Sequence, residues 1–286
     1  MARVKSPHDQ PADHDPEKPN HMILWLDLGI GEPKEYIHLK KAFGSNTDPR
    51  TERPMMLNDR DYEKILLIGD AVTVTFEGVT FLLQAFQREE DCLKAFKDNQ
   101  DKRIFFITSG SLGKEAVPKI ISQYGHVFTD PITNQPYPSI YVFCANIPLH
   151  MKWAGDYIEY VQMFNFDSEL LERMTRDIAE YFIERGQRLR RDNNLDEALK
   201  HLHWAKKLWY QYDKMIQRIG IDDLRVVVES QQAKEINVIV EELYQLCYPN
   251  QHVIWSGEVS HSQGNNDNRN SSDEDEDDTK VAQSSS

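Results

Sequence analysis

The chain has 286 residues, of which 40% are hydrophobic, and its formal charge is −14. This length suits one or two domains with a buried core, and so acidic a chain lacks the basic surface that binds nucleic acid without sequence preference. The cysteines, Cys92, Cys144 and Cys247, fit neither a disulfide framework nor a zinc site. No apolar run is long enough for a membrane span or a signal peptide. We therefore expect a soluble protein of the cytoplasm that contacts neither nucleic acid nor membrane.

The order of hydrophobic segments predicts an α/β module over residues 21–167, after a polar, Pro-rich stretch, 1–20, that we expect to be disordered. Between residues 80 and 166 strands alternate with helices, which is typical of a parallel sheet. We expect a doubly wound, mostly parallel sheet of about five strands, of the flavodoxin-like type. The least certain part is residues 61–86, where strands are expected at 65–68 and 79–86 with an irregular hairpin between them. Residues 44–60 are predicted to form a loop or insertion, and residues 114–124 a helix.

The centre of the predicted module is the stretch RIFFITSGSLGK, from Arg103 to Lys114. Its continuous apolar run is typical of a strand buried on both faces, and the small residues after it let the chain turn into a helix. Backbone N–H groups at a helix start can hold an anion or a carboxylate. Asp27 ends the first strand at the same edge of the sheet, where it either contacts a ligand or caps a turn. The candidates for ligand binding are Asp27, Ser109, Gly110, Ser111, Gly113 and Lys114.

Two catalytic interpretations of this stretch are weaker than the interpretation as a ligand-binding turn. It is too short for a nucleotide phosphate loop, and Glu115 stands where such a loop has a hydroxyl residue. Some TIR domains share this fold class and cleave NAD with a glutamate on a helix, and Glu115 is the nearest acid here. A place in the first turn of the helix, where the helix dipole favours an acid, explains Glu115 more simply. Processing of NAD or a nucleotide through Glu115 or Asp27 is kept as the alternative function.

Three helical segments follow in residues 168–248, and the first two are typical of one tetratricopeptide unit at residues 179–212. The pattern places a small residue, Gly186, where two antiparallel helices must approach closely. One unit is too few for a repeat solenoid, so a plain helical hairpin is an equal alternative. Trp204 and Trp209 on the second helix are candidates for contact with a protein partner.

Residues 249–286 are rich in Ser, Asn, Gly and acids, and they are predicted to form a disordered acidic tail. Ser271 and Ser272 precede the acidic run Asp273–Asp278, which is the context that kinases of the casein-kinase-2 type prefer. Ser271 and Ser272 are therefore candidates for phosphorylation, and an added phosphate would make the tail more negative for contact with a basic partner. A tail that only increases solubility is the alternative.

The segments WLD, EEDCLKAFKDN, RIFFITSGSLGKEAVPKI and SIYVFC occur in this order within residues 22–166. Together they resemble an uncharacterised α/β module of multidomain invertebrate proteins, related in fold to flavodoxin, receiver and TIR domains. In those proteins the module precedes tetratricopeptide repeats of the kinesin-light-chain style or an arginine-type mono-ADP-ribosyltransferase domain. The resemblance implies no catalytic residues, and nothing after residue 166 is long or β-rich enough to be the transferase. A regulatory fragment of such a protein is a further alternative.

The sequence contains no recognisable set of catalytic or metal-binding residues, and we expect no cofactor. The expected function is that of a non-enzymatic signalling or scaffold protein. It would bind a protein partner or a small anionic ligand at the turn formed by residues 109–114.

Overall fold

The computed structural model describes residues 19–47, 54–218 and 229–249. Its strands are β1 (His21–Leu26), β2 (Phe43–Thr47), β3 (Pro54–Met56), β4 (Val72–Phe76), β5 (Val79–Phe86), β6 (Arg103–Ser109), β7 (Ile140–Phe143) and β8 (Val161–Phe164). Its α-helices are α1 (Ile37–Lys41), α2 (Asp59–Ile68), α3 (Glu89–Asp98), α4 (Gly110–Tyr124), α5 (Ile147–Gly155), α6 (Asp167–Arg191), α7 (Leu195–Arg218) and α8 (Gln231–Cys247). The predicted phosphorylation sites Ser271 and Ser272 lie outside the described residues, as does nearly all of both segments predicted to be disordered.

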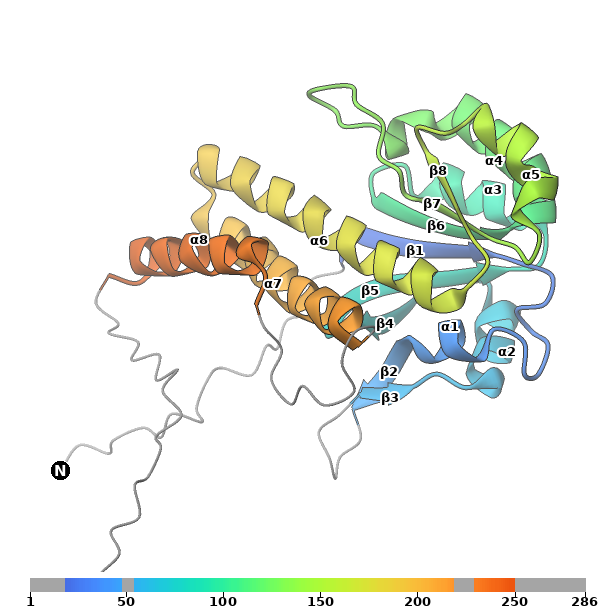
Figure 1. Cartoon of the computed structure of the whole chain (residues 1–286), viewed down its shortest axis with the longest axis horizontal. Coiled ribbons are helices and arrows are strands. Elements are labelled where there is room, and N and C mark those ends of the chain that lie inside the picture. Colours follow the sequence, from blue (N-terminus) through green and yellow to red (C-terminus); the bar gives the residue numbers. More distant parts are fainter. Residues whose placement is uncertain (1–18, 48–53, 219–228, 250–286) are drawn as a thin grey trace, which may run out of the picture. The chain divides into compact units, whose positions relative to one another are not determined.

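The strands form one eight-stranded mixed sheet in the order β3-β2-β4-β5-β1-β6-β7-β8 (Figure 1). Five neighbouring strands, from β5 through β1 to β8, are parallel, and β4, β2 and β3 extend the sheet in antiparallel pairs. The predicted α/β class is therefore confirmed. The prediction of five strands is wrong for the whole sheet, because the antiparallel extension was not expected.

Most of the differences from prediction lie between residues 43 and 76, where β4 was also not predicted as a strand. Residues predicted as a loop form β2 and β3, and residues 65–68, predicted as a strand, belong to α2. Asn58 starts this helix with a capping box: its side chain accepts from the Arg60 N–H, and the Asp61 carboxylate accepts from the Asn58 N–H at 3.0 Å. A short apolar run fits a helix or a strand equally well, and here the cap decides the outcome.

Helices cover both faces of the sheet. Along β1, Ile23 and Trp25 face one core, which includes residues of α1, α2 and α6. Met22 and Leu24 face the other core, which includes residues of α3, α4 and α5. Because each face of β1 and β6 is buried, the segments 22–26 of β1 and 104–107 of β6 are apolar at every position, as the sequence pattern indicates.

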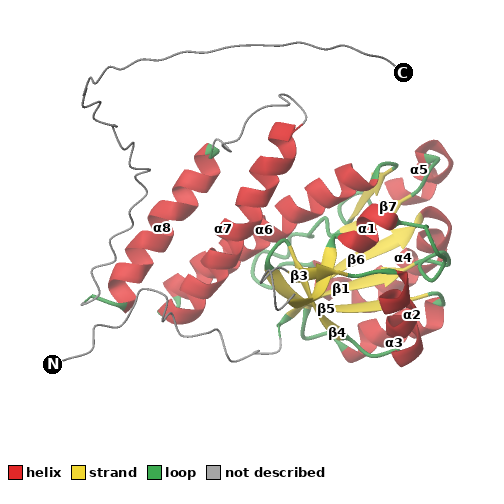
Figure 2. Cartoon of the chain, turned by 90° about the horizontal axis from the view of Figure 1, so that it is seen from below, coloured by secondary structure: helices red, strands yellow, loops and turns green. Residues whose placement is uncertain are grey.

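Helix α6 belongs to both the α/β layer and the helical layer. Its first half buries Leu170, Met174 and Ile178 in the same core as the sheet, so the core continues past the predicted module boundary at residue 167. Its second half packs along α7, with α8 beside α7 (Figure 2). At the closest approach, a Cβ on Gly186 would lie 2.7 Å from the Leu202 side chain. This is the close contact that the tetratricopeptide pattern requires of its small residues, although membership of that family stays a prediction.

Candidate functional site

At the carboxyl edge of the sheet, Asp27 directly follows β1, and Ser109 is the last residue of the neighbouring strand β6, so the two predicted residues lie beside each other. The Asp27 side chain is only 3% exposed and accepts a 2.7 Å hydrogen bond from the Gly29 N–H. The hydroxyl groups of Tyr36 and Ser109 are further donors to it. Burial raises the pKa of Asp27, and these hydrogen bonds oppose the rise. The carboxylate is thus occupied by its own loop, as a turn-capping residue would be.

Tyr36 occupies the space next to Asp27 over the end of β6. Its ring packs edge-on against Trp25 of β1 and Phe143 of β7, at centroid distances of 5.7 and 5.8 Å. Because β6 lies between β1 and β7, the ring spans the position where doubly wound folds usually bind a ligand. Its backbone has a φ of 54°, a conformation that costs a residue with a side chain about 1 kcal/mol or more and that the packing here maintains.

The glycines of the predicted anion turn serve the packing of α4 against its neighbours. A Cβ on Gly110 would lie 2.6 Å from the His150 ring of α5, and one on Gly113 would lie 3.2 Å from the Trp153 ring. Both glycines are buried. They let α5 approach the start of α4 closely, and this contact accounts for the small residues without an anion.

The remaining predicted residues of the turn, Ser111 and Lys114, are exposed on the surface of α4. This helix begins at Gly110 rather than at residue 114, because Ser109 adopts the extended backbone of an N-cap residue. Glu115 therefore lies beyond the first turn, which contains no acid. The prediction that Glu115 sits in the first turn is wrong.

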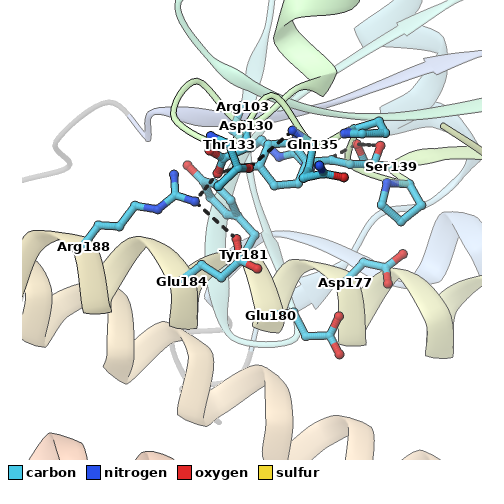
Figure 3. A pocket seen from close by; sticks show the side chains of 13 residues that line it. Arg103, Asp130, Thr133, Gln135, Ser139, Asp177, Glu180, Tyr181, Glu184 and Arg188 are labelled. Atoms are coloured by element: carbon cyan, nitrogen blue, oxygen red, sulfur yellow. Dashed lines mark hydrogen bonds and ion pairs between the residues drawn. The ribbon is translucent and has the colours of Figure 1, made fainter. Parts of the chain in front are cut away.

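A cavity of about 300 Å³ lies at the opposite edge of the sheet, where the parallel strands begin (Figure 3). Its floor is formed by the starts of β6 and β7. One wall is the loop of residues 129–139, and the other is the middle of α6. The charged and aromatic residues that line it include Arg103, Asp130, Tyr137, Tyr181, Glu184 and Arg188.

Asp130 organises the loop wall of this cavity. One carboxylate oxygen accepts 2.8 Å hydrogen bonds from the N–H groups of Ile132 and Thr133. The other oxygen accepts from the Tyr137 hydroxyl at 2.7 Å and from the Arg188 guanidinium of α6. Burial alone would raise the pKa of Asp130, but these hydrogen bonds outweigh it and hold that pKa well below its usual value. The loop is therefore fixed both to itself and to α6.

Arg103 lies on the floor with its side chain 9% exposed. Its guanidinium donates to the Val127 carbonyl at 3.3 Å and to the Ser139 hydroxyl at 3.2 Å, and it stacks 3.7 Å from the centroid of the Tyr137 ring. These bonds use two of its five N–H donors, and its Nε has no partner. In the part of the chain that the structure describes, no carboxylate forms an ion pair with it. Burial accordingly lowers the pKa of Arg103.

Acidic residues from successive turns of α6 line the opposite wall. Glu180 pairs with Arg176 at 2.8 Å on the rim. Glu184 lies 3.7 Å from Arg188 and keeps 54% of its side chain exposed. Asp177 is deeper and is satisfied by hydrogen bonds from Arg173, Gln162 and Tyr141. The cavity therefore has a cationic floor and an anionic rim.

Sequence reasoning did not identify this cavity. Arg103 was part of the central stretch, yet it was not singled out, although a charged residue at the start of a fully apolar strand was an available signal. In the sequence, residues 130–138 indicate only a Pro-rich connection between a helix and a strand. Since the residues of the cavity are far apart in the chain, only the tertiary fold brings them together.

The two tryptophans predicted to contact a partner pack within the helical layer. Trp209 is buried, and its indole N–H donates to the Ser230 hydroxyl at 2.8 Å. The Trp204 ring packs against Phe182 and His21 at centroid distances of 5.2 and 5.3 Å. These contacts give both side chains a role in packing, while their predicted contact with a partner stays a prediction.

Among the described residues, no three His, Cys, Asp or Glu side chains are grouped so that they could hold a metal ion. Of the helices in these described ranges, none combines the length and apolar character of a membrane span. Comparisons with protein-family models, curated proteins and solved structures gave no significant match. The function is therefore inferred from the cavity and its chemistry.

Proposed function

We propose that this chain is a non-enzymatic binding protein and that its binding site is the cavity between the loop of residues 129–139 and α6. The bound group is an anion, such as a carboxylate, seated at Arg103. The ligand is a small molecule, or a partner protein that presents such a group, which suits the signalling or scaffold role expected from the sequence.

The observation that supports this proposal is the isolation of the Arg103 guanidinium. A buried charge without a counter-charge is costly, and replacing it by an apolar side chain is often neutral or stabilising. A fold gains little from such a residue unless an anion from outside completes its bonding. An anion would take up the donors that the Val127 carbonyl and the Ser139 hydroxyl leave unused.

The carboxyl edge is a weaker candidate for the same ligand. Asp27 is occupied by the Gly29 N–H and by the hydroxyls of Tyr36 and Ser109, and two glycines of the turn are buried in helix packing. The parallel strand order from β5 to β8 supports the flavodoxin-like assignment of this half of the sheet. Flavodoxin-like proteins bind their ligands at the carboxyl edge of the sheet, so a ligand site at the opposite edge would distinguish this protein from them.

Calorimetric titration with 3-phenylpropanoate tests the proposal, because this probe combines a carboxylate with a flat apolar body that suits Tyr137 and Tyr181. We expect saturable binding that becomes at least about tenfold weaker in Arg103→Met, since charge-assisted hydrogen bonds are lost. Arg103→Lys, which retains the charge but not the planar donors, should bind with intermediate affinity.

Lys114→Met is the matched control, because it removes a cation from the turn of residues 109–114. This variant should bind the probe as the unaltered protein does. Binding that survives Arg103→Met, or that is lost in Lys114→Met, would overturn the assignment to this cavity.

A further inference from the structure

The cavity has two chemically different ends, and the side chain of Tyr137 connects them. Its ring stacks on the Arg103 guanidinium at 3.7 Å, while its hydroxyl donates to Asp130 at 2.7 Å. The Arg103 end is thus separated from the Asp130 end by about the length of one tyrosine side chain. Figure 3 shows Arg188 and Glu184 of α6 at the Asp130 end.

The Asp130 end carries an excess of negative charge. Asp130 and Arg188 neutralise each other in a direct ion pair, and Glu184 is left beside them, 3.7 Å from the same guanidinium. Glu180, one turn earlier on α6, already has its own partner in Arg176. Burial raises the pKa of Glu184; the charges of Arg188 and Arg103 oppose this rise, and those of Asp130 and Glu180 add to it. A cation placed next to Glu184 would relieve this repulsion.

The surface between the two ends is mainly aromatic, with two nearly perpendicular tyrosine rings. The rings of Tyr137 and Tyr181 lie 6.5 Å apart with an interplanar angle of 88°, and Pro136 and Pro138 complete this part of the lining. Such a surface favours an aromatic or other planar body. A ligand that fills the whole cavity therefore needs an anionic group for Arg103, a cationic group for Glu184 and a planar body that contacts the tyrosine rings.

We infer that the ligand is a zwitterion of the aromatic amino acid class, with its carboxylate at Arg103 and its ammonium group at Glu184. This inference rests on the proposed function and adds to it the cationic group and the residue that recognises it. The opposed charges at the two ends carry the inference: Arg103 lacks a carboxylate, and Glu184 has the least complete pairing of the acids on the α6 wall.

Three probes that differ by one charged group each test the inference by calorimetry: L-phenylalanine, 3-phenylpropanoate, which lacks the ammonium group, and 2-phenylethylamine, which lacks the carboxylate. We expect L-phenylalanine to bind about tenfold or more tightly than either single-charge probe, as a charge-assisted hydrogen bond provides. In Glu184→Gln the affinity for L-phenylalanine should fall to that for 3-phenylpropanoate. The affinity of this variant for 3-phenylpropanoate should equal that of the unaltered protein. Glu172→Gln, on α6 but outside the cavity, should change neither.

The outcomes separate the two claims. If 3-phenylpropanoate binds through Arg103 but L-phenylalanine binds no more tightly, the zwitterion is wrong and the proposed function stands. If 2-phenylethylamine binds as tightly as L-phenylalanine and does not need Arg103, the cavity is a cation site, and both claims are wrong. If no probe binds to the folded protein, the proposed function falls and the inference falls with it.

Discussion

At the scale of a single residue, Arg103 is the side chain whose burial costs stability and which the proposed function requires. Its side chain is buried, its Nε is unpartnered, and its compensation comes from two hydrogen bonds and the faces of aromatic rings. A desolvated cation–π contact is worth about 2 kcal/mol, whereas burying a charge costs several kcal/mol, so these contacts offset only part of the cost of an unpaired guanidinium. Under the proposed function, a bound anion would offset the rest of this cost.

A stability measurement on Arg103→Met follows from this comparison. Methionine fills a similar volume without a charge, so the free energy of unfolding should change by no more than about 1 kcal/mol, or should increase. Urea unfolding followed by circular dichroism measures it. A loss of about 3 kcal/mol or more would show instead that Arg103 is a structural residue.

His21 gives the protein a pH dependence of stability. It is 2% exposed, its Nε2 lies 2.8 Å from the Thr80 carbonyl oxygen, and burial lowers its pKa from 6.5 to about 4. Between these values the unfolded chain binds more protons than the folded one, so the free energy of unfolding falls as the pH decreases from 6.5 toward 4. The His21 contribution to this fall is on the order of 3 kcal/mol.

His21→Phe should remove that contribution and flatten the decrease. His201 and His203 also have their pKa lowered by burial, so part of the slope should remain. His126→Gln, at an exposed position, should leave the slope of the unaltered protein unchanged. Equal slopes for His21→Phe and the unaltered protein, in urea unfolding at pH 4.5 to 7, would contradict this account.

At the scale of elements, the contact between α6 and α7 depends on Gly186. A Cβ there would lie 2.7 Å from Leu202 Cγ and 3.2 Å from the Ala198 carbonyl oxygen. Alanine normally stabilises a helix relative to glycine by about 1 kcal/mol, but overpacking of this kind costs about 1 to 3 kcal/mol. Gly186→Ala should therefore lower the free energy of unfolding.

Gly155→Ala in α5 is the matched control, because its Cβ would meet no atom within 4 Å. It should leave the stability unchanged or raise it slightly, and denaturant midpoints compare the two variants. An unchanged midpoint in Gly186→Ala would show that α6 and α7 adjust to the added methyl group, contrary to the close packing described above.

At the scale of the whole molecule, α6 makes the sheet and the helical layer one folding unit. Its residues share a core with Phe81, Phe105 and Tyr141 of the sheet. A chain ending at residue 167 should therefore lack a cooperative thermal transition and should bind a hydrophobic dye, whereas one ending at residue 249 should unfold like the full chain. A sharp transition in the shorter chain would show instead that the module folds without α6.

Features of the fold that depend on residues close together in the chain could be predicted from the sequence, whereas contacts between distant segments could not. The parallel strands were predictable because burial on both faces makes them apolar throughout, as in the run from Ile104 to Ile107. Strands β2 and β3 were missed because both are short, β2 is mostly polar after Phe43, and the edge strand β3 begins with Pro54. The neighbours Asp27 and Ser109 were predictable from the rule that parallel strands end at one edge. The placement of Tyr36 over these two residues depends on contacts between distant segments, and so does the cavity at the other edge of the sheet.

The central claim is that Arg103 receives an anion, and the Nε–H signal of its guanidinium reports on it directly. We would record two-dimensional ¹H–¹⁵N spectra of the arginine Nε–H groups, with Arg103→Met to assign the signal, during a titration with L-phenylalanine. We expect a slowly exchanging signal that shifts saturably, with the dissociation constant found by calorimetry. A signal that stays in place while the probe binds would contradict it, because the anion would then lie elsewhere.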